Sequence, residues 1–482
     1  MSFGVGDIKF AYRIKIRFLR YNGGVLLTAV VEKMNVCRLA ENKKIIVLVD
    51  ANNFFVACER AFNPSLWNKP VVVLSNNDGN VIARSEEAKQ LGIQMGEVFH
   101  QRRHWYEQHG VRYFSSNYSV YLAKSQQIIR ILSRYARHLE YYSVDEAWLD
   151  LSDVGEVNVT QFCREIRQVI QKEARIPCSF GIGRNKTQAK LAAAFAKKQP
   201  KVHGVFNLIN HPLYEAILSR VSIDELWGIN RRLARRLHAL GIRTAQELAH
   251  ADLNCVLKKT NVNVGKILCE LRHQTCFTLQ KPSPPQMISV SLSFSYDTSS
   301  LQDVLEAAAC YVARAAVRLR QNRMAARHVS VFLNTNRYAK NQVYSVEHGE
   351  VQLRSHTIYT PDFIAATQKI VRQCFNPEKR YHKVTVMLSD LKPLEGMQKS
   401  LWDTRDWDKM AILMGLVDVL NERYGEGSFR FPEEGERQRW KVRRQYVSGA
   451  TVENMGLSEV DPGLVPICRI GTDALLVDGF GH

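Results

Sequence analysis

The chain has 482 residues, and 66 lysines and arginines against 47 acidic residues give a formal net charge of +19. This length predicts about three domains. The excess of cations favours a polyanionic partner, because each phosphate contact releases counterions. The ten cysteines lack C-x-x-C or zinc-finger spacing, and no apolar run approaches the roughly 18 residues of a membrane span. We therefore expect a cytoplasmic protein without a disulfide framework, zinc finger or membrane anchor.

The first carboxylate of interest follows an apolar run. Residues 1–44 are basic but lack the long apolar core and cleavage site of a signal peptide. After them, the apolar run 45–49 predicts a buried strand that ends at Asp50. Residues 50–59 then predict a helix, with Asp50 and Asn52 sharing a face.

The next segment carries two cations beside a predicted turn. Residues 69–92 predict a strand, a polar Asn-Asp-Gly turn, a second strand and a short helix. Arg84 and Lys89 are candidate contacts for an anionic ligand. The alternative for Lys89 is an ordinary cation on a helix surface.

Asp145 and Glu146 lie between two β-prone runs within residues 140–150. Mg²⁺ prefers oxygen ligands, so these acids and Asp50 could hold two divalent ions that assist an in-line phosphoryl displacement. Adjacent residues on a strand point in opposite directions, so both acids can serve one site only if the chain turns or bulges there. Taken alone, such a pair is more often a polar hairpin tip.

Two later segments suggest phosphate contacts. Phe180-Gly-Ile-Gly183 predicts a glycine-flanked turn before an alanine-rich helix that carries Lys190. Residues 226–242 resemble a helix-hairpin-helix, whose tight turn presents backbone N–H groups to a phosphate. Asn230 stands where a second turn glycine is usual. Because asparagine tolerates left-handed dihedrals better than most residues, we expect the turn to be kept. The arginines that follow it could instead form an exposed charged helix.

Beyond the Pro-rich linker 281–285, the pattern alternates strand, helix and strand to about residue 395. Residues 289–295 alternate strictly between serine and apolar side chains. The helix around Arg314 and Arg318 is basic, which suits contacts to phosphate and sugar rather than to bases.

Three segments together resemble the catalytic core of Y-family DNA polymerases, most closely its UmuC-like branch. They are Asp-x-Asn-x-Phe-Phe-x-x-Cys-Glu at 50–59, Ser-Val-Asp-Glu-Ala at 143–147, and Asn-Lys-x-x-Ala-Lys at 185–190. The resemblance implies an α+β multidomain fold of the right-hand polymerase type. The implied parts are an N-terminal extension (1–44), a palm (45–58 and 115–210), small fingers (59–114), a helical thumb with the helix-hairpin-helix (211–285), an α/β little finger (286–395) and a C-terminal tail (396–482).

The resemblance also implies roles for single residues. The metal ligands would be Asp50, Asp145, Glu146 and the backbone of Ala51, holding two Mg²⁺ ions. Phe55 would be the steric gate against ribose, the alternative being core packing. The nucleotide would be bound by Asn52, Phe54, Arg84, Lys89 and Lys190, and DNA by Gly228, Asn230, Arg231, Arg232, Arg235, Ser293, Ser295, Arg314 and Arg318. Glu86 departs from the family pattern, because an acid beside Lys89 would repel a triphosphate.

The termini carry further expectations. Gln398, Leu401 and Trp402 resemble the peptide that binds the bacterial sliding clamp. Residues 421–444 follow the UmuC-like tail, and residues after about 460 match nothing recognisable. Family members begin near the first catalytic strand, so residues 1–33 could be an upstream extension, with Met34 as the natural initiator.

The resulting hypothesis is low-fidelity, template-directed synthesis on primer-template DNA from deoxynucleoside triphosphates during the SOS response. The implied partners are the sliding clamp, a UmuD′-like dimer and RecA, with no membrane. One alternative is an inactive DNA-binding protein that recruits the clamp, although all three carboxylates are present. Another is a different palm-fold enzyme such as a nucleotidyl cyclase, which the helix-hairpin-helix and the basic C-terminal half argue against.

Overall fold

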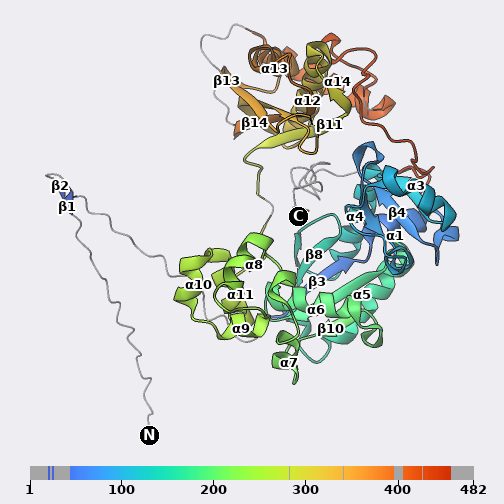
Figure 1. The fold of residues 1–482 in the computed structure, drawn as a ribbon, viewed down its shortest axis with the longest axis vertical. Coiled ribbons are helices and arrows are strands. Elements are labelled where there is room, and N and C mark those ends of the chain that lie inside the picture. The colour runs from blue at the N-terminus through green and yellow to red at the C-terminus, as the bar shows by residue number, and fades with distance from the viewer. Residues whose placement is uncertain are drawn as a thin grey trace.

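A computed structural model describes residues 44–281, 283–339, 341–395, 405–425 and 427–457, together with the backbone of two short strands, β1 (Arg20–Tyr21) and β2 (Gly24–Val25). The other residues of the N-terminal extension, the predicted clamp peptide at Gln398, Leu401 and Trp402, and all residues after 457 lie outside this part. Figure 1 shows three lobes below a fourth, which is built from the C-terminal strands and helices.

The first lobe is built on a five-stranded sheet with the order β10-β9-β3-β8-β7. Its strands are β3 (Ile46–Ala51), β7 (His138–Tyr141), β8 (Glu146–Asp150), β9 (Cys178–Gly183) and β10 (Val205–Asn207). Only β9 and β10 pair in parallel. Helices α1 (Phe54–Phe62), α4 (Tyr118–Leu132) and α5 (Val159–Glu173) share a core with one face, and α6 (Lys186–Lys198) packs on the other.

The alternation of β3 explains why its whole apolar run is buried. Val47 and Val49 belong to the core beneath α4 and α5, whereas Ile46 and Leu48 pack with Trp148 against α6. Successive residues of a strand face opposite sides. Asp50 therefore lies on the α6 face.

The second lobe is small and has a sheet with the order β5-β4-β6. It contains β4 (Val71–Leu74), β5 (Val81–Arg84), β6 (Arg112–Ser115), α2 (Glu86–Gln90) and α3 (Phe99–Gln108), with short 3-10 turns at Pro64–Leu66 and Asn76–Asp78. The strand-turn-strand-helix prediction for residues 69–92 is confirmed.

The third lobe is helical and has its own core. Its helices are α7 (Tyr214–Leu218), α8 (Arg231–His238), α9 (Ala245–His250), α10 (Leu253–Lys259) and α11 (Val262–Leu271). The linker that follows is exposed over most of residues 280–287. It leads into the fourth lobe.

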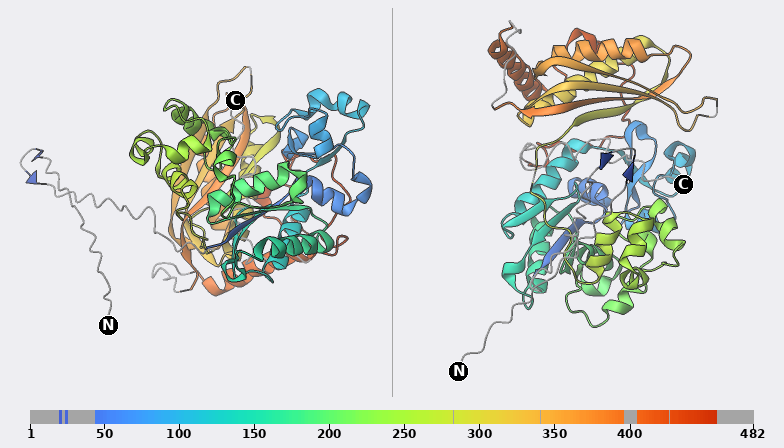
Figure 2. Two further views of the ribbon diagram at one scale, coloured as in Figure 1. Left: turned by 90° about the horizontal axis from the view of Figure 1, so that it is seen from below. Right: turned by 90° about the vertical axis from the view of Figure 1, so that its left-hand side faces the viewer.

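The fourth lobe is a four-stranded antiparallel sheet with the order β11-β14-β12-β13. Its elements are β11 (Ile288–Thr298), α12 (Leu301–Gln321), β12 (Met324–Thr335), β13 (Val346–Thr357), α13 (Thr360–Cys374), β14 (Tyr381–Pro393) and α14 (Trp407–Tyr424). Figure 2 shows this lobe as a separate layer over the other three. The α+β multidomain fold predicted from the sequence is confirmed.

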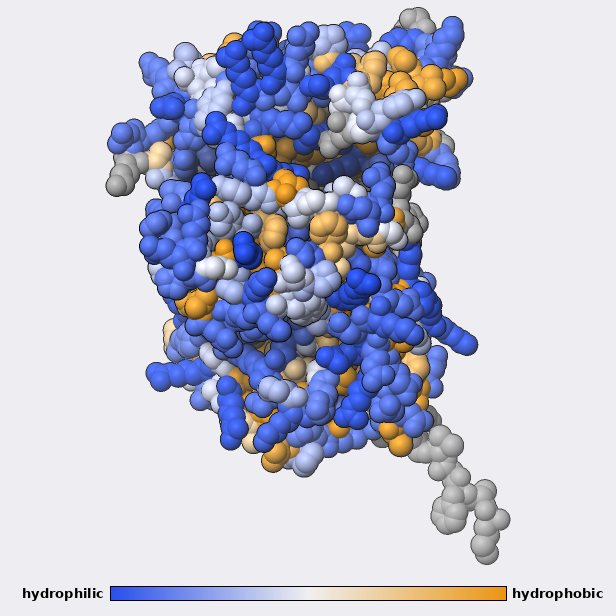
Figure 3. All heavy atoms as spheres, turned by 90° about the vertical axis from the view of Figure 1, so that its right-hand side faces the viewer, coloured by the Kyte–Doolittle hydropathy of each residue, from blue (hydrophilic) through white to orange (hydrophobic). Residues whose placement is uncertain are grey.

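No helix in the described part of the chain is both long and apolar enough to cross a lipid bilayer. The face in Figure 3 is hydrophilic over most of its area, in keeping with a net charge of +19.

The prediction of a glycine-flanked turn at Phe180-Gly-Ile-Gly183 is wrong, because both glycines lie inside strand β9. Their role is to let α6 approach the sheet. A Cβ atom on Gly181 would lie 2.1 Å from both the Ala189 carbonyl oxygen and the Ala193 nitrogen, and one on Gly183 would lie 2.6 Å from the Ala189 nitrogen. Close backbone packing therefore requires glycine at these positions.

Gly181→Ala is expected to destabilise the fold, because the new methyl group meets helix backbone that cannot move aside. Overpacking of this kind costs roughly 1–3 kcal/mol or more. The matched control is Gly415→Ala on the exposed side of α14, where an added Cβ meets nothing within 4 Å and alanine should stabilise the helix by roughly 0.5–1 kcal/mol. Chemical denaturation of both variants measures the difference. Equal stability would contradict the packing role of Gly181.

Candidate active site

Asp50 and Glu146 are cross-strand partners. Strands β3 and β8 pair antiparallel with Asp50 opposite Glu146, and directly opposed residues place their side chains on the same face of a sheet. Both acids therefore project on the α6 side. Because they lie far apart in sequence, this pairing is set by the register of the two strands.

Asp145 reaches the same place from a turn. It lies between β7 and β8, one residue before β8 begins, and its carbonyl oxygen accepts a hydrogen bond of 2.8 Å from the Ala51 nitrogen. The Ser143 hydroxyl donates to its Oδ1 atom at 2.5 Å. Asp145 lies in the turn and not in the strand, so its side chain need not point away from that of Glu146. The turn that two adjacent acids require is thus present.

The three carboxylates share a poorly solvated space. Burial raises the pKa of Asp145, and the charge of Asp50 raises it further, while the Ser143 hydrogen bond opposes the shift. Burial also raises the pKa of Glu146; Lys190 opposes that shift, and the charges of Asp50 and Asp145 add to it. A bound divalent cation would reverse these shifts, because it favours the ionised form of each acid.

Helix α6 supplies the countercharges. Lys190 forms an ion pair with Glu146, and the Lys197 ammonium lies 2.5 Å from Asp50 Oδ1. One turn earlier, Lys186 pairs with buried Glu140 at 2.6 Å. The sequence reasoning identified Lys190 but missed Lys197. The sequence did offer a signal for Lys197. It follows Lys190 by seven residues, which is about two helical turns, so both lysines lie on the same face of the helix.

These ion pairs occupy the acids that were predicted to bind metal. Among the described residues, no three His, Cys, Asp or Glu side chains are already arranged to hold one ion. The Glu146 and Asp50 carboxylates are instead directed to Lys190 and Lys197 of α6. The donor set still fits a hard cation, because it consists of carboxylate oxygens beside a backbone carbonyl. Metal binding would require these side chains to leave their lysines.

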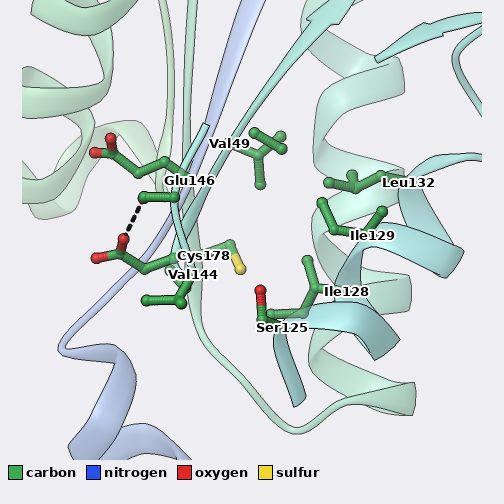
Figure 4. A pocket seen from close by; sticks show the side chains of 12 residues that line it. Val49, Ser125, Ile128, Ile129, Leu132, Val144, Glu146 and Cys178 are labelled. Atoms are coloured by element: carbon green, nitrogen blue, oxygen red, sulfur yellow. Dashed lines mark hydrogen bonds between the residues drawn. The ribbon is translucent and has the colours of Figure 1, made fainter. Parts of the chain in front are cut away.

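The other side of the hairpin is apolar. Figure 4 shows Glu146 pointing away from a small pocket lined by Val49, Ile129, Leu132 and Cys178. Carboxylates and apolar core therefore occupy opposite sides of the sheet. This packing holds the hairpin beneath the acids, whose other side faces α6.

The predicted gate residue Phe55 is 8% exposed. Its ring stacks on Tyr121 at 4.8 Å between centroids and meets Tyr118 edge-on at 6.0 Å. Phe54 is also buried. Asn52 accepts a hydrogen bond of 2.9 Å from Ser179, the residue opposite Asp50 on β9. The core packing considered for Phe55 is present, and its role as a gate stays a prediction.

The cations of the second lobe differ in placement. Lys89 donates to Asn53 Oδ1 at 2.9 Å, directly before α1, and to Glu86 Oε1 at 2.6 Å; Asn53 also donates to Glu86 at 3.0 Å. Lys89 therefore lies next to the segment that follows Asp50, with its charge neutralised by Glu86. Arg84 instead donates to the Ile93 carbonyl within its own lobe, so its contact with a nucleotide stays a prediction.

The turn before α8 is present, but Asn230 does not use the left-handed conformation that asparagine tolerates. Its φ is −85°, and its side chain accepts a hydrogen bond of 3.0 Å from the Leu233 nitrogen as the N-cap of α8. Gly228, with φ +80°, makes the left-handed turn instead, since glycine pays no Cβ penalty there. Arg231, Arg232 and Arg235 follow on exposed positions of α8.

The residues predicted to contact DNA in the fourth lobe lie on two elements, β11 and α12. Residues of β11 alternate between the core shared with α12 and the opposite face, so Ser293 and Ser295 lie on the face away from α12. Arg314 and Arg318 lie on α12 itself. Ser295 is moreover hydrogen-bonded to the tail, through its nitrogen to the Trp440 carbonyl at 3.1 Å. The contact of these four residues with DNA stays a prediction.

The sequence matches three family descriptions in order. Residues 49–194 match the impB/mucB/samB family, and residues 285–401 match the C-terminal domain of the same family. Residues 411–452 match a domain of unknown function, DUF4113. This last match covers most of α14 and the tail that follows it.

Several curated relatives and solved structures are similar over most of their length. Protein UmuC of Salmonella typhimurium is 36% identical over 84% of this chain and 97% of its own, and Protein MucB of Escherichia coli is 33% identical over 84% and 96%. A DNA polymerase IV of Moorella thermoacetica is 28% identical over 79% and 94%.

Among solved structures, a Y-family DNA polymerase chimera of Dbh and Dpo4 superimposes with a TM-score of 0.61 at 22% identity, covering 72% of this chain and 99% of the other. An insertion ternary complex of Dbh DNA polymerase gives a TM-score of 0.51 at 21% identity, with the same coverage. The chain therefore belongs to the impB/mucB/samB family and has the fold of Y-family DNA polymerases.

Proposed function

We propose that this protein is a DNA-directed DNA polymerase of the Y family that copies damaged templates with low fidelity. The observation that carries the proposal is the convergence of Asp50, Asp145 and Glu146 at one end of the palm sheet, with the lysines of α6 above them. The same activity is supported by the similarity of this chain to relatives named UmuC and DNA polymerase IV.

In the proposed reaction the primer 3′-oxygen attacks the α-phosphorus of a deoxynucleoside triphosphate, and pyrophosphate leaves. Lys190 and Lys89 neutralise the triphosphate, a role that suits compact ammonium groups. The aromatic ring of Phe55 lies beneath the sugar and excludes a 2′-hydroxyl. Two Mg²⁺ ions, held by the three acids and the Ala51 backbone, would supply the charge that stabilises the attacking and leaving oxygens.

The wider setting follows from the relationship to UmuC. We propose primer-template DNA as the macromolecular substrate, with the arginines of α8 contacting its phosphates, and action on cytoplasmic DNA during the SOS response. A sliding clamp that binds Gln398, Leu401 and Trp402, a UmuD′-like dimer and RecA are the proposed protein partners. A bypass assay on a lesion-bearing template, with and without clamp and RecA filament, tests these partners together.

Asp145→Asn should abolish primer extension in the presence of Mg²⁺, because it removes a charged ligand while leaving the turn intact. A metal's stabilisation of transition-state charge is worth several kcal/mol, so we expect a loss of at least about a thousandfold in kcat. Asp153→Asn, an exposed acid just beyond the same hairpin, is the matched control. Extension that survives in Asp145→Asn would refute the metal assignment and favour a protein that only binds DNA.

Phe55→Leu should raise ribonucleotide incorporation, because a smaller side chain leaves room for a 2′-hydroxyl. We expect the ratio of kcat/KM for deoxynucleotide over ribonucleotide to fall at least about tenfold, as when a steric contact worth 1–3 kcal/mol is lost. Phe162→Leu, a half-buried ring on α5, controls for general loosening of the palm. Unchanged sugar discrimination in Phe55→Leu would leave this ring as core packing alone.

Glu86→Gln should lower the KM for the incoming nucleotide, because Lys89 would no longer be neutralised and the triphosphate would meet one fewer negative charge. The pair is partly exposed, with side-chain exposures of 66% and 36%. Such pairs are worth up to about 1 kcal/mol, which corresponds to a change of about two- to fivefold. Glu87 neighbours Glu86 on α2 and pairs with Arg60 of α1, so Glu87→Gln should leave KM unchanged. A higher KM in Glu86→Gln would show that Glu86 helps to place Lys89.

A further inference from the structure

The C-terminal tail returns from the fourth lobe to the second and first lobes. Figure 1 shows it descending from the region of α12 and α14 to α3, on the side opposite the linker that enters β11. Its starting point is Trp440, which is 2% exposed within the core of the fourth lobe and donates to Glu306 on α12 at 3.3 Å. The tail is therefore anchored before it leaves this lobe.

Three residues later the main chain of the tail is held by the second lobe. The Arg443 nitrogen donates to Asn77 Oδ1 at 2.9 Å, and the Gln445 nitrogen donates to Asp78 Oδ2 at 2.8 Å. Two hydrogen bonds join Tyr446 to Ser115. The Tyr446 nitrogen donates to the Ser115 hydroxyl at 2.9 Å, and the Ser115 nitrogen donates to the Tyr446 carbonyl at 3.0 Å. At residues 443 and 445 these contacts involve the main chain of the tail and not its side chains. They therefore hold the path of the backbone.

Side chains then complete the attachment. The Tyr446 ring packs against Tyr113 and Phe99, with centroids 4.9 and 5.7 Å away. Further on, Ala450 is buried in the palm core, and its carbonyl accepts a hydrogen bond of 2.9 Å from Asn117. One segment of the chain thus contributes to the cores of three lobes.

Asn77 connects three parts through one amide. While its oxygen accepts from the tail, its nitrogen donates to the Phe294 carbonyl on β11 at 2.8 Å. Asn77 and Asp78 both have left-handed backbones, with φ of 60° and 52°. Consecutive non-glycine residues in this region are costly and persist where surrounding contacts hold them. The turn between β4 and β5 is shaped for this junction.

The second covalent route between the lobes is held less closely: after Gln280, whose nitrogen donates to Glu140, residues 283–287 of the linker are largely exposed. We propose that residues 440–450 form a strap that holds the little finger against the fingers, with Asn77 as its positioning residue. The strap assigns a role to the tail that matches a domain of unknown function. This role rests on the proposed polymerase activity. The strap would keep the little finger on the duplex between nucleotide additions, and so would set how many nucleotides are added each time the enzyme binds DNA.

Asn77→Ala tests the strap in the full chain. It removes the donor to Phe294 and the acceptor for Arg443, so hydrogen exchange of the Arg443, Gln445 and Tyr446 amides should accelerate by about tenfold or more, as expected for lost hydrogen bonds. The number of nucleotides added in one DNA encounter, measured with a trap for free enzyme, should fall several-fold. The kcat for a single insertion at saturating DNA should stay within about twofold of wild type.

Asn68→Ala is the matched control, because Asn68 has nearly the same backbone strain, with φ of 59°, but lies away from the tail. A second variant, Asn77→Asp, tolerates the left-handed backbone and keeps the oxygen that accepts from Arg443 while losing the donor to Phe294. It should accelerate exchange less than Asn77→Ala, and it keeps the test open if the alanine variant fails to fold.

Two results would overturn the strap. The first is equal amide exchange in Asn77→Ala and Asn68→Ala, and the second is faster exchange with unchanged product lengths. If the wild-type protein extends no primer, the proposed polymerase activity fails instead, and the exchange experiment still reports whether the strap holds the lobes.

Discussion

The burial of three like charges at one end of a sheet is the constraint around which this molecule is organised. Asp50, Asp145 and Glu146 repel one another and are poorly solvated, so they require positive charge nearby. Helix α6 provides it through Lys190 and Lys197. The helix can lie close enough only because Gly181 has no side chain. The acids thus need the lysines of α6, and α6 in turn needs a residue without a side chain beneath it in the sheet.

The same lysines stabilise the acids. Buried carboxylates without a partner would be costly, and their pKa values would rise further. Asp50 and Glu146 each pair with a lysine of α6 and lie opposite one another in the sheet. In the proposed reaction the acids would bind the divalent ions, and Lys190 would bind the triphosphate. Glu86 and Lys89 form a similar ion pair in the second lobe.

The lobes are linked by two connections of different kinds. The linker that enters β11 is largely exposed over residues 283–287, whereas the tail is buried at Trp440 and Ala450 and hydrogen-bonded between them. In the proposed function, holding the fourth lobe by this second connection would keep DNA bound between nucleotide additions.

The sequence by itself determined the local elements and the identity of the acids. Periodicity predicted β3 and the strand-turn-strand-helix of residues 69–92, because these patterns depend on neighbouring residues. Tertiary structure decided what those patterns could not: that β3 and β8 pair Asp50 with Glu146, that Lys197 joins the site, that the glycines of β9 serve helix packing, and that Asn230 is a cap while Asn77 is a junction. Each depends on contacts between segments far apart in the chain, whose register and distance leave no periodic signal in the residues themselves.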